Sequence, residues 1–517
     1  MSRETEIRFT ARAEELSQLL RDSALDGFAV GEAVTHRLNS LYYDTLELSL
    51  AKAGLSLRVR KNGRGYIQTV KDASSGALLS ERSESECELP SAEPDMERIP
   101  DEGLRERIRS LGQPGKFEPV VETQIRRTTR AITSAAGDEV ELALDKGEIR
   151  PLLNGHGAVP VNELELELKR GAPIALYEIA RRLSRKAPLT ISVESKSARG
   201  LRAVQNGQIC ANKPGRAALP KHCITEDVFA ATLAHCLRHL TSNIAALADA
   251  RLPEGVHQMR VGLRRLRAAL AGAGPLFHMR VLQILRDRAK TLADMFGDTR
   301  ELDVFGTELL PPVEQSAKLA GLPPLRLVLE ELRRDSWDRT IALVQSDDFT
   351  GFLIDLGAAI ETRIWREGAS PEQLSEFSQP AAEHAAKILA KKLKTACRRA
   401  QHLSSLNVEE RHRLRIALKT LRYSAEFFAP LFPAPAAADF LKRLSRLQDL
   451  FGTLNDAAAT SAILRRIVEH GGERSSMEFL EAAAFVDGWH QSRVGPTWQK
   501  AKRRWKRFVK TEPFWDS

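Results

Sequence analysis

Residues 4–9 read ETEIRF, a stretch in which every second side chain is charged. In a β-strand, successive side chains point to opposite faces of the sheet, so Glu4, Glu6 and Arg8 would share one face. A soluble sheet usually turns one face to an apolar core and the other to water. The charged face of this strand therefore either faces solvent or lines a polar interior, and the neighbouring sequence bears on that choice.

Runs with the same alternation recur through residues 1–203, and each has one apolar face and one charged face. The runs are LSLRVR (55–60), YIQTVK (66–71), EVELALD (139–145) and NELELELK (162–169), with HRLNSLYYDT (36–45), RSESECEL (82–89) and ETQIRRTTRAI (122–132) beside them. They amount to about eight strands, which is enough to close a small antiparallel barrel. Short helical patterns lie between them, so the sequence predicts an α+β fold that begins with an eight-stranded antiparallel β-barrel.

The charged faces of these runs carry carboxylates and bases together. If the charged faces point outward, the barrel has an apolar interior and an ordinary charged surface. If they point inward, the interior holds both signs of charge, which suits a metal–phosphate complex, and helices must cover the apolar outside. NELELELK places three carboxylates along one line, and such oxygen ligands suit Mg²⁺ or Mn²⁺. Periodicity alone leaves both orientations open.

The second half of the chain has a different pattern and a different charge. Residues 206–222 lose all periodicity and contain Gly and Pro, which predicts a linker over 204–223. Beyond it, residues 224–510 have the 3.6-residue period of helices. Residues 1–215 carry 32 basic and 32 acidic residues, so the whole formal charge of +9 lies in the remainder. A basic half predicts a polyanionic partner such as nucleic acid, an anionic membrane surface or polyphosphate.

The helical half also contains an internal repeat. HQMRVGLRRLRAAL (257–270) matches HRLRIALKTLRYSA (412–425), and LADMFG (292–297) matches LQDLFG (447–452), both at an offset of 155 residues. A shared offset predicts a duplicated unit, which we expect to form two helical bundles related by a pseudo-twofold axis.

Each repeat carries a basic ridge along one face of its first helix, at about 100° per residue. The first ridge comprises His257, Arg260, Arg264 and Arg267, and the second comprises His412, Arg415, Lys419 and Arg422. Like charges at this spacing repel one another, so an anionic partner would stabilise both helices. Guanidinium groups suit phosphate oxygens, and protonated histidines would add donors. A solvated face is the alternative, but the duplication favours a binding role.

The composition narrows the choice of partner and compartment. The ridges lack the interleaved aromatic and base-reading side chains of sequence-specific nucleic-acid proteins, so recognition of polyphosphate fits them at least as well as recognition of nucleic acid. The N-terminus is charged where a signal peptide would be apolar, and no stretch predicts a membrane span. The five cysteines show no CxxC spacing, so we expect neither a disulfide framework nor a zinc site. These features predict a cytoplasmic protein without a membrane partner.

Residues 1–203 resemble a CYTH domain, the family of triphosphate tunnel metalloenzymes. ETEIRF is similar to the ExExK signature that opens the family, and LYYDT, LSLRVR, TVK, RSESE, ELALDKGE, ELELELK and ESKSARG follow in order. Arg8 stands where the signature has Lys. Arginine keeps the charge but lacks the compact ammonium, so we expect phosphate binding to survive while geometry and rate change.

Residues of about 220–510 resemble a CHAD domain, a helical module associated with inorganic polyphosphate. The likeness rests on the two basic ridges, on FGDTRELDVF (296–305) in the first repeat and on LFGTLNDAAAT (450–460) in the second. The sequence thus predicts a CYTH-like domain over 1–203, a linker over 204–223 and a CHAD-like domain over 224–510, the arrangement of a bacterial inorganic triphosphatase.

The resemblance implies metal-dependent hydrolysis of inorganic triphosphate to pyrophosphate and phosphate inside the barrel. The catalytic residues it implies are Glu4, Glu6 and Arg8. The phosphate-binding residues are Arg58, Arg60, Lys71, Arg82 and Arg126, with Lys196 and Arg199. The ligands of Mg²⁺ or Mn²⁺ are Glu163, Glu165, Glu167 and Asp145. The eight ridge residues would bind inorganic polyphosphate in the helical domain.

Other functions are compatible with the same residues. The protein could be a scaffold that retains polyphosphate while its tunnel is weak or inactive, with Arg8 as the cause. It could instead hydrolyse a nucleotide triphosphate or thiamine triphosphate. Cyclase activity on ATP would need a base-recognising pocket, which the sequence does not display.

Overall fold

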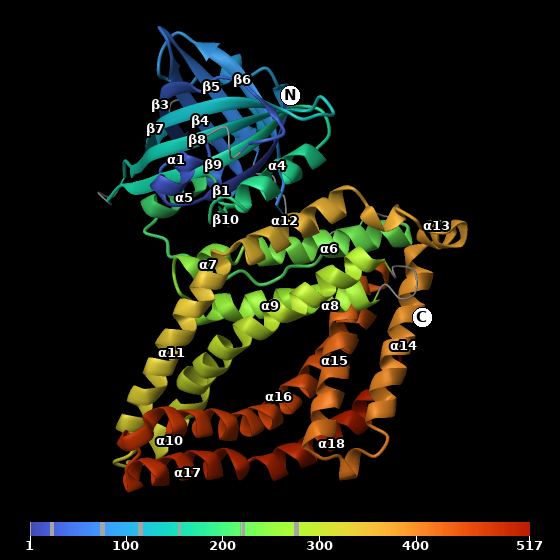
Figure 1. Ribbon diagram of the computed structural model, residues 1–517. Helices are drawn as coiled ribbons and strands as arrows, with labels where there is room; N and C mark the ends of the chain where they lie inside the picture. The colour runs from blue at the N-terminus through green and yellow to red at the C-terminus, as the bar shows by residue number, and fades with distance from the viewer. Residues whose placement is uncertain are drawn as a thin grey trace. The chain divides into compact units, whose positions relative to one another are not determined.

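The computed structural model describes residues 2–20, 25–72, 78–111, 117–153, 157–217, 219, 223–272 and 279–516. Its contacts divide the chain into two compact units. The first comprises Met1–Cys210 with Ile244–Ala250 and Leu343–Thr362, and the second comprises Ala211–Asn243, Arg251–Ala342 and Arg363–Ser517. The first unit is built around an antiparallel sheet and the second is helical (Figure 1), which confirms the predicted order of the two fold types.

The first unit contains all the strands that the structure describes. They are β1 (Ser2–Thr10), β2 (Ala29–Val30), β3 (Val34–Asp44), β4 (Leu55–Asn62), β5 (Gly65–Asp72), β6 (Ser80–Leu89), β7 (Glu118–Thr133), β8 (Glu139–Pro151), β9 (Val159–Arg170) and β10 (Thr190–Ile191). The helices of this unit are α1 (Ala13–Gln18), α2 (Ser49–Lys52), η2 (Met96–Arg98), α3 (Glu102–Leu111), α4 (Ile174–Ser184), α5 (Lys196–Val204), α7 (Ile244–Ala248) and α12 (Asp347–Glu361).

The strands pair in the order β1, β6, β5, β4, β3, β7, β8 and β9, and every pairing is antiparallel. Strand β1 uses its two halves differently, because residues 2–6 pair with β6 and residues 6–10 pair with β9. The two-residue strands β2 and β10 pair with β7 and β1. Strand β1 thereby joins strands from both ends of the order.

The apolar face of the sheet packs against helices rather than against the middle of the domain. Leu55, Leu57 and Val59 on β4 are buried in a cluster that includes residues of α2, η2 and α3. On β1 and β9, which contact α4, the apolar side chains of Ile7, Phe9, Val161, Leu164 and Leu166 are also buried. Since Arg58 and Arg60 alternate with these residues, the charged side of β4 points the other way.

Helix α5 lies close to strands β7 and β8 because Gly200 has no side chain. A Cβ added at Gly200 would lie 2.5 Å from Cγ1 of Val121 and 3.0 Å from Cγ2 of Ile149. Such distances are too short for two carbon atoms, so only glycine allows this approach. The contact fixes the helix that carries Lys196 and Arg199.

The second unit is made of helices and short helical turns. They are α6 (Thr225–Thr241), α8 (Pro253–Gly272), α9 (Arg280–Val304), η4 (Phe305–Leu309), α10 (Leu310–Ser316), α11 (Leu322–Val344), η5 (Ile364–Arg366), α13 (Pro371–Phe377), α14 (Ala381–Arg399), η6 (Leu403–Ser405), α15 (Val408–Phe428), η7 (Ala429–Leu431), α16 (Ala434–Gly471), η8 (Gly472–Arg474), α17 (Met477–Gln491) and α18 (Val494–Phe508). No helix among the residues that the structure describes is both long enough and apolar enough to span a membrane.

The two sequence repeats occupy equivalent helices. The first repeat lies on α8 and α9, and the second lies on α15 and α16. Leu263 on α8 and Leu418 on α15 are both fully buried, as are Phe296 on α9 and Phe451 on α16. Helices α8 and α9 contact each other, as do α15 and α16. The duplicated helix pair is therefore visible in the structure, while the pseudo-twofold relation between whole bundles stays a prediction.

Candidate functional site

The charged side of the sheet lines a cavity of about 360 Å³. Each of the eight longer strands in the described chain contributes to its wall. The lining carboxylates are Glu4, Glu6, Glu84, Glu86, Glu141, Asp145, Glu165 and Glu167, and the lining bases are Arg8, Arg58, Arg60, Lys71, Arg127, Lys169 and Lys196. Eight acids thus face seven bases, which agrees with the inward orientation and not with an apolar interior.

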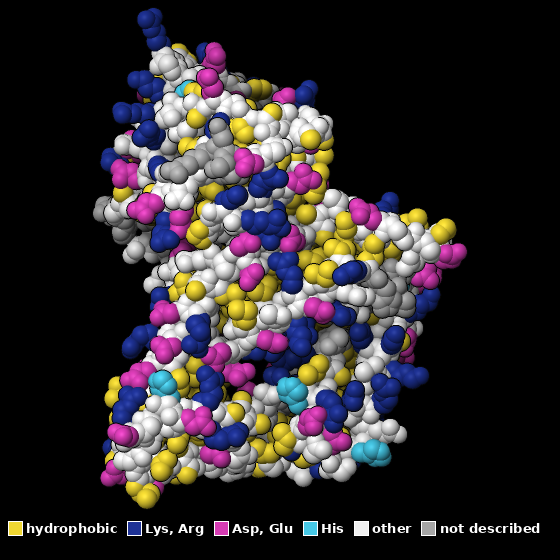
Figure 2. Space-filling model, in the orientation of Figure 1, with side chains coloured by type: hydrophobic (Ala, Val, Ile, Leu, Met, Phe, Trp, Pro, Cys, Tyr) yellow, Lys and Arg dark blue, Asp and Glu magenta, His cyan; other side chains and the backbone are white. Residues whose placement is uncertain are grey.

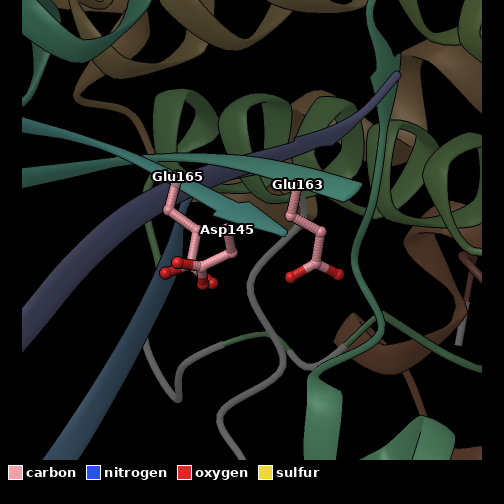
Figure 3. Close-up of side chains that lie close together, drawn as sticks. All are labelled: Asp145, Glu163 and Glu165. Atoms are coloured by element: carbon pink, nitrogen blue, oxygen red, sulfur yellow. The ribbon is translucent and has the colours of Figure 1, made fainter. Parts of the chain in front are cut away.

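Three carboxylates form an acidic cluster beside this cavity; Asp145 and Glu165 line the cavity, and Glu163 is not part of its lining. Asp145 on β8 and Glu163 on β9 are cross-strand partners, and Glu165 follows two residues later on the same face. One oxygen from each of the three lies within 4.8 Å of the others. Figure 3 shows the carboxylates of Asp145 and Glu165 next to each other, with Glu163 pointing the same way beside them. We call these three residues the acidic triad.

Basic side chains surround the acidic triad. The ammonium of Lys196 lies 2.8 Å from Asp145, 2.5 Å from Glu163 and 2.6 Å from Glu165. Arg127 donates to both oxygens of Asp145, at 2.7 and 2.6 Å, and also to Glu165. Arg199 donates to Glu163. The negative charge of the acidic triad is therefore balanced by three bases of the same chain.

These contacts set the charge state of the triad. Burial alone would raise the pKa of Glu165, but Lys196, Arg127 and Arg8 lower it well below its usual value. Burial would lower the pKa of Lys196, yet Glu165, Glu163 and Asp145 raise it. Glu165 is therefore ionised and the Lys196 ammonium is protonated at neutral pH. Buried, ionised carboxylate oxygens are the donors that a hard divalent cation prefers, so the residues present fit Mg²⁺ or Mn²⁺.

Arg8 reaches from β1 to the chain segment that leads into α5. Its guanidinium donates to the backbone oxygens of Val193 and Glu194, both at 3.3 Å, and lies 3.3 Å from the Glu6 carboxylate. Burial would lower the pKa of Arg8, but Glu6 and Glu165 raise it, so the group stays charged. The fork of the arginine thus serves two backbone carbonyls and one carboxylate at once, which a lysine could not do.

A second network of charges lies on β1, β4, β5 and β6. Lys71 is 2.6 Å from Glu4 and 3.3 Å from Glu84. Arg58 lies 3.8 Å from Glu84 and 3.6 Å from Glu86, and it donates to the hydroxyl of Thr69 at 2.9 Å. Acids and bases alternate around this wall, so neither sign of charge dominates here.

Arg60 is a base of this wall for which the described residues offer no acidic partner. Among the described residues, no carboxylate lies within ion-pairing distance of Arg60, whose Nε donates to the Ser40 hydroxyl at 3.3 Å. Burial, followed by repulsion from Arg58 and Arg127, lowers its pKa to about 10. A buried, uncompensated guanidinium is stabilised by an anion, so this region suits a phosphate group.

The structure changes the set of phosphate-binding candidates. Arg126 is exposed and does not line the cavity, whereas its neighbour Arg127 does, so Arg127 replaces Arg126 among the candidates. Adjacent residues of a strand face opposite ways, and an arginine pair gives no sign of which one points inward. The side chain of Arg82 lies outside the described residues. Arg199 contacts Glu163 but is not part of the cavity wall.

Among the predicted metal ligands, the structure separates one residue from the other three. Glu167 lies 2.7 Å from Lys169, which is also 3.6 Å from Glu141. It lines the cavity but is absent from the acidic triad. Sequence reasoning missed Lys169 and Arg127, although Lys169 closes the alternating run NELELELK and could have been found from it.

In the helical unit, the middle parts of the two basic ridges come together. Helices α8 and α15 contact each other. Burial, together with Arg415, Arg264 and Arg260, lowers the pKa of Lys419 to about 7. Burial and Arg264 also lower the pKa of Arg260 to about 10. None of these four bases has a carboxylate within ion-pairing distance in the described chain, so we call them the central bases.

The ends of the ridges are arranged differently. Arg422 is 2.7 Å from Glu426 and donates to Gln448, and it lines a separate cavity of about 850 Å³ with His257. Burial and the nearby Arg300 lower the pKa of His257 to about 4, so this imidazole is neutral and adds no charge. His412 instead forms a hydrogen bond of 3.0 Å with Asn455. The expectation of charged histidine donors is therefore not met at His257.

Arg267 lies near the Asp294 carboxylate, which opposes the lowering of its pKa by burial. The face drawn in Figure 2 shows a hollow in the helical unit with Lys and Arg side chains gathered around it. The central bases, rather than all eight ridge residues, are thus the candidate polyanion site.

The fold and both sites define a CYTH domain followed by a CHAD domain. Residues 2–201 match the CYTH domain family and residues 231–465 match the CHAD domain family. The chain belongs to the proteins that combine these two domains in this order.

Known proteins resemble the chain to different extents. An uncharacterized protein of Mycobacterium tuberculosis is 26% identical over 452 residues, which cover 83% of this chain and 82% of that protein. The inorganic triphosphatase of Haemophilus influenzae is 27% identical over 166 residues, which cover 32% of this chain and 45% of that protein. The crystal structure of the CHAD domain from the plant Ricinus communis is 25% identical with a TM-score of 0.50, covering 58% of this chain and 98% of that structure.

Proposed function

We propose that the CYTH domain hydrolyses inorganic triphosphate to pyrophosphate and phosphate, with Mg²⁺ or Mn²⁺ as cofactor. The observation that carries this proposal is the cavity wall of eight carboxylates and seven bases. Because β1 pairs with both β6 and β9, we infer that the strands enclose a tunnel. The similarity to the inorganic triphosphatase of Haemophilus influenzae supports the same reaction class.

The bases of the cavity would hold the phosphate groups. Arg60 lacks an acidic partner in the described chain, and Arg58 and Arg127 lie close enough to lower its pKa. A negatively charged phosphate between them would relieve this repulsion and form charge-assisted hydrogen bonds. Lys71 would reach a phosphate after exchanging part of its contact with Glu4.

Asp145, Glu163 and Glu165 would hold the divalent ion, and Glu6 lies on β1 opposite Glu167 of the neighbouring β9. When bound, such an ion neutralises phosphate oxygens and lowers the pKa of a coordinated water. In the reaction, the oxygen of a water molecule bonds to a terminal phosphorus while the bridging P–O bond breaks and its electron pair leaves with pyrophosphate. Glu4 and Glu6 line the cavity and would orient that water by accepting hydrogen bonds from it, while the proton that the water loses passes to the departing pyrophosphate or to solvent.

Substitution of one triad residue tests the proposal. Glu165→Gln keeps the shape of the side chain but removes its charge, so metal-dependent phosphate release from tripolyphosphate should fall by about 100-fold or more. Glu139→Gln is the matched control, because this β8 carboxylate is exposed and paired with Arg170. Released phosphate is measured with Mg²⁺, Mn²⁺ or EDTA, and with a nucleotide and thiamine triphosphate as competing substrates. Release that is equal in EDTA would contradict metal dependence.

We further propose that the CHAD domain binds inorganic polyphosphate through the central bases Arg260, Arg264, Arg415 and Lys419. The supporting observation is that two helices bring these four bases together with no carboxylate of the described residues within ion-pairing distance, although Asp456 lies near Arg415 and Lys419. Arg264→Ala combined with Arg415→Ala should weaken polyphosphate retention on a native gel, while Arg443→Ala, an exposed residue paired with Asp439, should not. Retention by the wild type without any turnover of tripolyphosphate would favour a scaffold instead of an enzyme.

A further inference from the structure

The acidic triad already holds a cation, and that cation belongs to the protein. The Lys196 ammonium is within 2.8 Å of all three carboxylates. Lys196 also lines the phosphate cavity, so the same side chain borders both parts of the site. A metal ion bound to these oxygens would occupy the space that the ammonium now fills, because metal–oxygen distances are about 2.0–2.6 Å.

Helix α5 presents Lys196 from a fixed position. Ser195 caps the helix by accepting from the backbone N–H of Ala198 at 3.1 Å. Arg8 donates to the two backbone carbonyls just before this cap, and Arg202 in the helix forms hydrogen bonds of 3.0 and 2.9 Å with Glu194. Since the helix backbone is held on several sides, the flexible side chain of Lys196 is the part that can move.

The charges of the triad explain why that movement would matter. Three carboxylates face Lys196, Arg127 and Arg199, so the cluster is neutral as it stands. Adding a divalent cation while Lys196 stays in place would give a buried excess of positive charge, which is strongly unfavourable. Withdrawal of one ammonium removes both the steric conflict and half of that excess.

We propose that Lys196 is an internal cation that competes with the divalent metal ion for Asp145, Glu163 and Glu165. Metal binding then requires the ammonium to leave the triad for the adjoining cavity, where it faces the phosphate groups. Lys196 is thus a positioning residue that couples metal loading to the phosphate-binding charge of the cavity. The choice of a divalent metal ion comes from the proposed function. The tests of this proposal, however, measure metal binding and not the hydrolysis of triphosphate.

The first test compares Mn²⁺ affinity in full-length variants by calorimetry and by the electron paramagnetic resonance signal of free Mn²⁺. Lys196→Met removes the competing charge at similar length, so Mn²⁺ should bind about tenfold tighter or more than in the wild type. Lys169→Met is the matched control, since Lys169 lines the same cavity but pairs with Glu167 and Glu141. Unchanged or weaker Mn²⁺ binding by Lys196→Met would overturn the proposal.

The second test uses the wild-type protein and does not depend on a folded variant. Amine-acylating reagent and mass spectrometry report how accessible each lysine is, with and without Mn²⁺. Labelling of Lys196 should rise severalfold when Mn²⁺ binds, while labelling of Lys169 should not. If Mn²⁺ binds while the labelling of Lys196 stays the same, the proposed movement of Lys196 is contradicted. If neither the wild type nor Lys196→Met binds Mn²⁺, the proposal is contradicted as well. Tighter Mn²⁺ binding in Lys196→Met without any tripolyphosphate turnover would remove the proposed hydrolysis and leave this inference standing.

Discussion

Substitution of Arg8 by lysine restores the residue of the ExExK signature, and we predict that it harms this protein. Arg8 forms two hydrogen bonds to the backbone oxygens of Val193 and Glu194. A lysine has a single compact ammonium group, which cannot bond to both backbone carbonyls and to the Glu6 carboxylate at the same time. The segment that carries Lys196 would therefore lose part of its anchorage, although the charge at the position is kept.

The size of the effect follows from the geometry. Both hydrogen bonds are 3.3 Å long, just beyond the usual range for N–H···O bonds, so each is assigned about 1 kcal/mol despite the charged donor. A loss of about 2 kcal/mol corresponds to roughly 30-fold faster local opening. Arg8 is only 4% exposed, so water cannot fully replace the lost bonds.

Hydrogen–deuterium exchange followed by mass spectrometry measures this opening directly. Amide exchange over residues 193–204 should be faster in Arg8→Lys than in the wild type, and hydrolysis of tripolyphosphate should be slower. Arg12→Lys is the matched control, because Arg12 is exposed and pairs only locally with Glu15. Unchanged exchange in Arg8→Lys, together with higher activity than the wild type, would show that Arg8 is a poor substitute for the signature lysine and would refute the reasoning.

Two further substitutions test the packing of α5 and the charge of the central bases. Gly200→Ala should lower the free energy of unfolding by about 1–3 kcal/mol, because its Cβ would overlap Val121, whereas Gly103→Ala on α3 should be nearly neutral in calorimetry. Lys419→Met should raise the stability at pH 6 by about 2 kcal/mol, a value reduced for partial solvation. The unfolded chain holds the Lys419 proton up to about pH 10.5 and the folded chain only to about pH 7, so wild-type stability rises between these values. The gain from Lys419→Met should vanish above that window, and a gain that persists at pH 11 would exclude this cause.

The sequence was a good guide to which faces of the sheet are charged. Period-two alternation identifies the faces whatever the neighbouring strands do, and the structure agrees for Glu6, Arg60 and Glu165. The sequence did not show whether the charged face points inward or outward, because alternation alone does not tell which face of a sheet is enclosed. Adjacent Arg126 and Arg127 show the limit, because one must point inward and only the pairing of β7 with its neighbours decides which.

Contacts between distant segments were beyond reach of the sequence pattern. Lys196 follows Asp145 by 51 residues and lies on a helix, so no periodicity places its ammonium among strand carboxylates. The ridges show the same limit at smaller scale. Helical spacing correctly placed Arg264 and Lys419 on basic faces, but only the packing of α8 against α15 makes them neighbours. The pair of Arg422 and Glu426, in contrast, is four residues apart on one helix and could have been expected from helical spacing.

Most bases of the cavity are paired with carboxylates, whereas among the described residues the central bases of the helical domain are not. This difference predicts which kind of ligand each domain can bind. In the cavity of the sheet, bases such as Lys71 already contact carboxylates such as Glu4, so an anion alone would meet repulsion from acids and a cation alone would meet repulsion from bases. Only a ligand that brings both signs, such as a triphosphate with a divalent ion, can replace the internal ion pairs without leaving a buried charge unpaired. The central bases of the helical domain have no carboxylate within ion-pairing distance in the described chain, so a metal-free polyanion would suffice there. Polyphosphate retention by the helices should therefore persist in EDTA, under conditions that abolish phosphate release in the cavity.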